Sequence, residues 1–132
     1  MLRTHAEMAA AMAAALPGFA NVPPARWMAE AELHYRQTDT GLEITYDPRL
    51  RDAVEAGGDV PDLWPFFDAL AGKPTCLIRG AGSNLLHADT VAKMQARRPD
   101  MIYANVPDRG HVPFLDEPEA VAALTAWMEE LT

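Results

Sequence analysis

The sequence predicts an α/β fold with an incomplete core: two strands of a parallel sheet and their helices, preceded by a mostly helical segment. In the second half of the chain, two apolar runs of strand length alternate with two helical patterns. That order is typical of a βαβ unit with parallel strands. Parallel strands occur almost only inside larger sheets that are covered on both faces. Two such strands alone therefore indicate a core that other strands would complete.

The first predicted element is a helix at the start of the chain. Thr4 and Glu7 match a capping box, in which each side chain satisfies a free backbone amide of the first turn. Pro17 and Gly18 end the helical pattern. Arg3 before an alanine-rich run is faintly similar to a signal peptide, but Glu7 interrupts that run. We interpret the segment as an ordinary helix.

A second helix is predicted over residues 24–36. Trp27, Ala31 and Tyr35 recur at four-residue spacing behind a proline suited to a first turn. Residues 38–48 then alternate apolar and polar side chains, which predicts a short extended segment.

Two shorter helical patterns follow, "PRLRDAVEAGG" and "DLWPFFDAL". The glycine pair that closes the first of them marks a seam in the chain. We therefore predict a helical segment over residues 1–61 and an α/β part over residues 62–132.

The second half of the sequence reads as strand, helix, strand, helix. Asp116 and Glu119 match a second capping box, and an apolar stripe follows one face of the last helix. The predicted strands are residues 74–80 and 100–107, and the predicted helices are residues 88–98 and 116–131.

Composition excludes several classes of partner. The chain has 132 residues and a formal net charge of −8, without a basic stripe, so neither nucleic acid nor an anionic membrane surface is an expected partner. No run approaches the roughly 18 apolar residues that a membrane helix needs. A single cysteine, Cys76, lies in an apolar run and is expected to be buried and inert, which fits a cytoplasmic protein.

The turn "GAGSNLL" after the first strand invites comparison with phosphate-binding loops. Gly80 and Gly82 match the start of G-x-G-x-x-G, but Leu85 occupies the third glycine position and no Walker lysine is present. Over about seven residues the turn resembles the flavin-phosphate loop of the FAD-dependent reductases of cell-wall precursor synthesis, and nothing on either side extends that match. We expect no cofactor, and a flavin protein is kept only as an alternative.

A longer resemblance covers the second half. "PTCLIRGAGSNLL" and, after the second strand, "VPDRGHVPFLDEPEAV" are similar to the C-terminal portion of the α/β-hydrolase family. "DLWPFFDAL" resembles the segment where that chain re-enters the core from its cap. The match is strong over about residues 62–131. Residues 1–61 are similar, with weaker motifs, to the cap that precedes the penultimate strand.

The resemblance implies roles for two residues. His111 matches the family's catalytic histidine, the general base that takes the proton of a serine and returns it to the leaving group. The alternative for this side chain is a loop histidine that bonds to backbone. Asn84 stands where the family usually has the aspartate that orients the histidine. The amide oxygen can accept a hydrogen bond from the imidazole N–H but cannot neutralise an imidazolium, and the acid-to-amide change in a protease triad costs about 10⁴ in kcat. Asp108 and Asp89 could replace the acid, although both read more simply as solvated loop and helix-cap residues.

The nucleophile of such a site is absent from this sequence. G-x-S-x-G occurs nowhere, and Ser83 is out of register for a nucleophile elbow. In the family, that elbow and the oxyanion hole precede the cap. A thiol within a buried strand has a raised pKa, so Cys76 is no substitute.

The resemblance therefore implies part of a serine hydrolase that acts on a small ester-like or similar acyl substrate, inactive alone. Trp27, Trp64 and Phe66 are expected to line an apolar substrate pocket. The four histidines are scattered, so no metal site is expected. The alternative of another class is a non-catalytic module that complements a separately encoded N-terminal half, or that self-associates through its strand edge.

Overall fold

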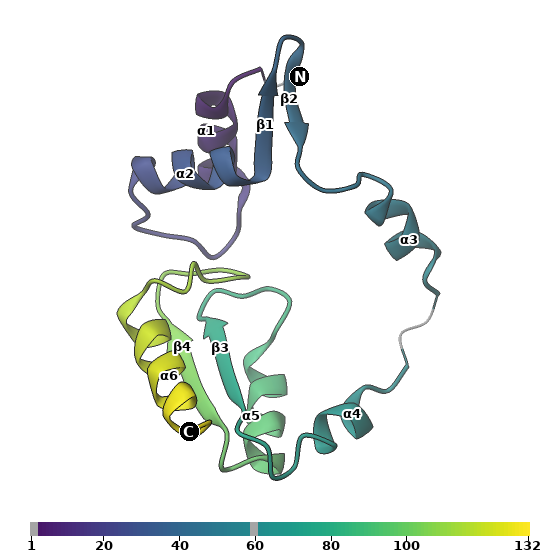
Figure 1. Cartoon of the computed structure of the whole chain (residues 1–132), viewed down its shortest axis with the longest axis vertical. Coiled ribbons are helices and arrows are strands. Elements are labelled where there is room, and N and C mark those ends of the chain that lie inside the picture. Colours follow the sequence, from purple (N-terminus) through teal and green to yellow (C-terminus); the bar gives the residue numbers. More distant parts are fainter. Residues whose placement is uncertain (1–2, 59–60) are drawn as a thin grey trace. The chain divides into compact units, whose positions relative to one another are not determined.

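The computed structural model describes residues 3–58 and 61–132 of the chain. They form two compact units. In Figure 1 the chain is coloured by position along the sequence. The first unit consists of Met1–Leu16 and Asn21–Pro61, and the second consists of Pro17–Ala20 and Asp62–Thr132. The chain thus changes unit after Pro61, near the predicted seam. The short link Pro17–Ala20 groups with the second unit although its neighbours belong to the first.

Two helices, α1 (His5–Ala15) and α2 (Pro24–His34), pack against each other in the first unit. The predicted capping box at the start of α1 is confirmed: the Thr4 hydroxyl accepts from the Glu7 amide at 3.2 Å, and the Glu7 carboxylate accepts from the Thr4 amide at 3.2 Å. The core of this unit consists of the buried side chains Ala9, Trp27 and Ala31.

A β-hairpin follows α2, where the sequence predicted more helix and then one extended segment. Strands β1 (Tyr35–Thr38) and β2 (Gly41–Ile44) are antiparallel, with Tyr35 opposite Ile44. The prediction that α2 reaches residue 36 and carries Tyr35 is therefore wrong. The strand pairing, which the four-residue spacing cannot reveal, takes over at Tyr35. Helix α3 (Leu50–Ala56) completes the first unit.

The second unit contains the α/β part of the chain. It begins with the short helix α4 and continues as strand, helix, strand, helix, in the predicted order. Its elements are α4 (Trp64–Asp68), β3 (Cys76–Gly80), α5 (Ala88–Arg97), β4 (Ile102–Val106) and α6 (Pro118–Glu129).

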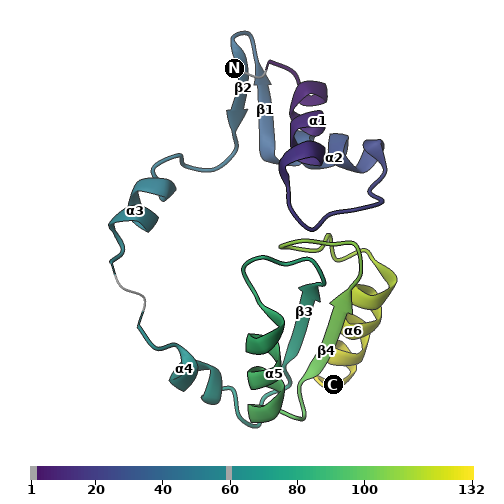
Figure 2. The ribbon, with the colours of Figure 1, turned by 180° about the vertical axis from the view of Figure 1, so that it is seen from behind.

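The prediction of a parallel strand pair is confirmed. β3 and β4 are parallel neighbours, in a register that runs from Cys76 opposite Ile102 to Gly80 opposite Val106. Figures 1 and 2 show α6 beside β4 and α5 beside β3. Among the described residues no third strand joins this sheet. The fold is therefore α/β with an incomplete core, as the sequence predicts.

One prediction for the last helix is wrong in detail. Helix α6 begins at Pro118 with Glu117 as its N-cap residue and without a side-chain cap hydrogen bond, so Asp116 and Glu119 do not form a capping box. Its buried residues are Ala120 and Ala123, whereas much of the predicted apolar stripe is solvent-exposed. The exposed members of the stripe are Val121, Met128 and Leu131.

Candidate functional site

The loops after β3 and β4 carry the two predicted site residues, and the structure brings these loops together. The amide of Ala81 donates to the carbonyl of Val106 at 2.8 Å, and the amide of Gly82 donates to the carbonyl of Arg109 at 2.9 Å. Because the strands are parallel, both loops leave the same edge of the sheet. In open α/β sheets that edge, at the carboxyl ends of the strands, is where ligands bind.

The glycines of the first loop are explained by close backbone approaches. A Cβ atom at Gly80 would collide with the carbonyl oxygens of Arg109 and Gly110. A Cβ atom at Gly82 would lie 2.6 Å from the Cα atom of Gly18. The glycine pattern that resembles a phosphate loop therefore serves to let three backbone segments pack together.

Ser83, the chain's only serine, closes a turn in this loop. Its side chain is buried, and its hydroxyl accepts from the amides of Leu85 at 3.4 Å and Leu86 at 3.1 Å. A hydroxyl committed to these amides is a structural cap. This agrees with the expectation that Ser83 is not a nucleophile.

A buried arginine, which was not predicted from the sequence, fixes the loop after β3 through hydrogen bonds to its backbone. Arg79 on β3 is 9% exposed, and its Nε donates to the carbonyl of Leu86 at 2.7 Å. Its Nη1 donates to the carbonyl of Ala81 at 3.2 Å and to the side-chain oxygen of Asn105 at 3.0 Å. One guanidinium therefore joins both ends of the first loop to strand β4. The only sign of this role in the sequence is that Arg79 is a charged residue in an otherwise apolar strand.

The second loop is held by an ion pair that the sequence reasoning also missed. The Arg109 Nε donates to Glu117 Oε1 at 2.7 Å, and both side chains are largely buried. The Glu117 carboxylate also accepts from the amides of Phe114 at 3.1 Å and Leu115 at 2.9 Å. Arg109, before His111, and three residues after it are thus tied into one network.

His111 and Asn84 themselves are exposed on these adjacent loops. Within the part of the chain that the structure describes, neither side chain makes a hydrogen bond or an ion pair, with the other or with backbone. The alternative reading of His111 as a backbone-bonded loop histidine thus finds no bond in its favour. The pairing of His111 with Asn84 stays a prediction.

The two aspartates that could replace the missing acid occupy ordinary positions. Asp89 is exposed in the first turn of α5, and Asp108 is exposed in the turn after β4, with a φ of 55°. The thiol of Cys76 is half-buried rather than fully buried, and burial raises its pKa. A thiol that holds its proton is a poor nucleophile.

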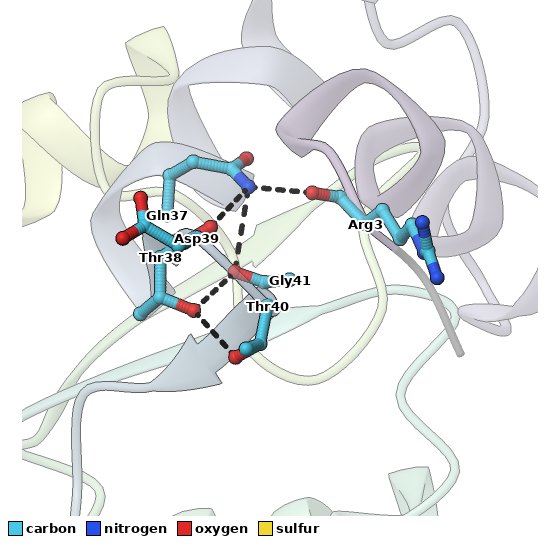
Figure 3. Close-up of a pocket in the computed structure, with 6 residues that line it drawn as sticks. All are labelled: Arg3, Gln37, Thr38, Asp39, Thr40 and Gly41. Atoms are coloured by element: carbon cyan, nitrogen blue, oxygen red, sulfur yellow. Dashed lines mark hydrogen bonds between the residues drawn. The ribbon is translucent and has the colours of Figure 1, made fainter.

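Three hollows are each lined by residues of a single unit. A polar hollow of about 500 Å³ surrounds the hairpin turn, where Gln37 Nε2 donates to the Arg3 carbonyl at 2.6 Å and the Arg3 guanidinium points away from the turn (Figure 3). Trp27 lines an apolar hollow of about 320 Å³ in the first unit. Trp64 packs against Phe67 in the second unit, and Phe66 is 71% exposed. A pocket that these three predicted residues share therefore stays a prediction.

An apolar groove of about 340 Å³ lies along β3 in the second unit. Cys76 and Ile78 of β3 form one side of it, and Leu124 and Trp127 of α6 form another. Among the described residues, no group of three or more His, Cys, Asp or Glu side chains is arranged to hold a metal ion. No helix in the described ranges is long and apolar enough to span a membrane.

Comparison with known proteins gives no match to a family model. It does give a curated relative, a 3-hydroxybutyrate-oligomer hydrolase of Cupriavidus necator, which is 36% identical over 116 residues that cover 79% of this chain and 39% of the relative.

Solved structures cover nearly the whole chain. An α/β hydrolase from Novosphingobium aromaticivorans is 34% identical with a TM-score of 0.84, over 97% of this chain and 46% of that one. An E-2-(acetamidomethylene)succinate hydrolase, 23% identical with a TM-score of 0.67 over 99% of this chain and 46% of its own, shares the fold. The chain thus spans less than half the length of these proteins.

Proposed function

Because this chain belongs to the α/β hydrolases, whose C-terminal portion it matches, we propose that it carries the general-base arm of a serine hydrolase site. His111 is the base in this proposal, and Asn84 orients it. The nucleophile and the oxyanion hole come from polypeptide outside these 132 residues. The first unit corresponds, in this proposal, to the cap segment of the family.

One observation carries the proposal. The amide of Gly82 bonds to the carbonyl of Arg109 at 2.9 Å, so the loops that bear Asn84 and His111 are hydrogen-bonded neighbours. Both side chains are exposed at the carboxyl edge of the sheet, where a second polypeptide can approach them. A base needs this access to a hydroxyl that its own chain does not supply.

The chemistry assigned to the two side chains is acyl transfer. The His111 imidazole removes the proton of the serine hydroxyl as that oxygen attacks the acyl carbon, and it then protonates the departing alkoxide. In the complete site, we expect the Asn84 side-chain oxygen to accept from the other ring N–H and to hold the imidazole in the useful tautomer, as in cysteine–histidine–asparagine sites.

We further propose that the substrate is a small ester. The curated relative is named as a hydrolase of 3-hydroxybutyrate oligomers, and it matches 79% of this chain.

The test is a chimaera in which this chain replaces the matching segment of the Novosphingobium aromaticivorans hydrolase. We expect hydrolysis of p-nitrophenyl acetate or of a 3-hydroxybutyrate dimer, with a loss of at least about 10³-fold on His111→Ala. The matched control is His87→Ala, which removes another exposed histidine of the same unit. Equal activity of the two variants would refute the assignment of His111.

A second candidate function is a non-catalytic module that completes a separately encoded partner. The observation that favours it is the unextended β3–β4 sheet, because parallel strands require neighbours. Such a module would raise the soluble yield of its partner as strongly with His111→Ala as with His111. A hydrolase arm would give equal yield but lost turnover, so co-expression followed by an ester assay separates the two.

A further inference from the structure

The link Pro17–Ala20 lies on both loops of the candidate site. It packs with the second unit, although it connects two helices of the first. A Cβ atom at Gly110 would collide with the Pro17 carbonyl oxygen and lie 2.7 Å from the Phe19 ring. The amide of Ala20 donates to the carbonyl of Asp108 at 3.0 Å.

Arg109 is the residue at which the link and the two loops meet. Its backbone carbonyl accepts from Gly82 of the first loop at 2.9 Å. Its Nη1 donates to the carbonyl of Ala20 at 3.1 Å, and its Nε donates to Glu117 at 2.7 Å. The guanidinium carbon also lies 5.2 Å from the centre of the Phe114 ring.

Glu117 completes the support on the other side of His111. Its two carboxylate oxygens accept from the amides of Phe114 and Leu115, and it is only 7% exposed. A buried carboxylate bound by a guanidinium and two amides has strong, charge-assisted bonds. The backbone is therefore fixed two residues before His111 and again three and four residues after it.

From this geometry we propose that Arg109 and Glu117 are positioning residues for His111. They set the direction of the His111 side chain by fixing the loop, and Pro17–Ala20 gives them a third point of attachment. The proposal rests on the proposed role of His111, but its test needs no catalysis.

The variants are Arg109→Lys and Glu117→Gln, made in the full chain. Lysine keeps the charge but cannot donate to Glu117 and Ala20 from a fixed fork. Glutamine keeps the shape of Glu117 and removes its charge. The matched control is Arg98→Lys, since Arg98 is also buried and donates to a carboxylate and to two backbone carbonyls. Arg98 lies before β4, whereas Arg109 lies after it.

The measurements are amide hydrogen exchange at Phe114 and Leu115, the NMR signals of the His111 ring, and the melting temperature. We expect both positioning variants to speed exchange of the two amides about tenfold relative to the amides of β4, and to shift and broaden the His111 ring signals. Arg98→Lys is expected to lower the melting temperature without either local effect.

The proposal is overturned if the two positioning variants leave the amides and the His111 signals as Arg98→Lys leaves them. Should Arg109→Lys fail to fold, the same comparison with the isosteric Glu117→Gln decides the matter. Inactivity of the chimaera with unchanged support of the loop would count against the proposed function only.

Discussion

At the scale of single residues, the departure of this chain from the family pattern is Asn84. An amide orients an imidazole without stabilising its charged form, so in the proposed site general-base catalysis by His111 is expected to be weakened rather than abolished. The loop that presents Asn84 is nevertheless held in place by side-chain hydrogen bonds. Ser83 caps its turn and the Arg79 guanidinium holds its ends, so a carboxylate placed there would inherit a fixed position.

We therefore predict that Asn84→Asp raises kcat in the chimaera, by up to the roughly 10⁴-fold that the reverse change costs in a protease triad. The measurement is the steady-state rate of ester hydrolysis. Asn105→Asp is the control, because it adds the same charge at another residue of the unit, bound to Arg79. A gain that Asn105→Asp reproduces would show that added negative charge, and not the position of the acid, is responsible.

Cys76 supplies a prediction about reactivity. Burial, and next the negative charge of Glu130, raises the pKa of its thiol. At pH 8 the folded chain then holds less thiolate than the unfolded chain, so alkylation by iodoacetamide is expected to be slower in buffer than in urea. A group with a raised pKa favours the fold below its unfolded pKa, and this contribution is lost as the pH rises through the folded pKa. Equal alkylation rates in buffer and urea would contradict the shift.

At the scale of the elements, the ends of β4 are fixed by different arginines. Before the strand, the buried Arg98 guanidinium donates to Asp100 and to the carbonyls of Leu70 and Lys73. These bonds tie the end of α5 to the segment that leads into β3. The hydrogen bond from Arg98 lowers the pKa of the Asp100 carboxyl below its ordinary value of 3.8.

This lowered pKa predicts an acid-dependent loss of stability. A carboxylate with a depressed folded pKa contributes stability above its unfolded pKa, and the contribution disappears as the pH falls through the folded pKa. Melting temperatures measured from pH 6 down to pH 2.5 should therefore fall less steeply for Asp100→Asn than for the parent chain. Glu43→Gln is the control, because it removes an exposed carboxylate in an ion pair of the first unit. Equal slopes for parent and Asp100→Asn would contradict the prediction.

The close approach of the Gly82 and Gly18 backbones gives a prediction about packing. Gly82→Ala brings a Cβ atom to 2.6 Å from the Gly18 Cα, where only backbone could yield. We expect it to cost about 1–3 kcal/mol of unfolding free energy, measured by urea denaturation. Gly57→Ala is the control, since its nearest neighbour would lie at 3.3 Å and its φ of −67° suits alanine. Similar stabilities of the two variants would mean that the backbones separate easily.

The elements also show which features the sequence could predict. Strands β3 and β4, their helices and the loop positions of Asn84 and His111 follow from local patterns of apolar residues and turns. Tyr35 was placed on a helix because its spacing from Ala31 is helical, while its true partner, Ile44, lies nine residues further on. Long-range pairing of this kind leaves no local signal.

The supports of the candidate site escaped the sequence for the same reason. Arg109 and Glu117 are eight residues apart, and the contact of Arg109 with Ala20 spans 89 residues. The helix cap was predicted at Asp116 and Glu119, whereas it is the carboxylate of Glu117 between them that binds the loop before the helix. The loop positions of the candidate residues were predictable from a family motif, whereas the residues that hold these loops were visible only in three dimensions.

At the scale of the whole molecule, the sheet is open along β3. The amide of Ile102 donates to the Thr75 carbonyl, and the amide of Ala81 donates to the Val106 carbonyl. In a parallel pair, alternate residues of one strand direct their backbone N–H and C=O groups to the same neighbouring strand. Thr75 and Ala81 face β4, so Cys76 and Ile78 direct their backbone groups away from β4. No strand among the described residues meets them there. Their side chains also line the apolar groove beside α6.

An open parallel edge beside an apolar groove predicts self-association of the chain on its own. Unpaired strand edges and exposed apolar surface both drive chains together. We expect the mean molar mass from light scattering to rise above that of the 14.4 kDa monomer between micromolar and hundred-micromolar concentration. Ile78→Lys, which sets a charge in the groove, should reduce this rise.

The matched control is Leu85→Lys, which adds the same charge at a 69% exposed apolar residue of the loop after β3, outside the groove-lining set. Both variants must first show the circular dichroism spectrum of the parent, so that unfolding is not mistaken for a change in association. If Leu85→Lys suppresses association as much as Ile78→Lys does, net charge and not the β3 edge controls it. If the parent stays monomeric throughout, the edge is protected, and the case for a partner strand at β3 loses its physical basis.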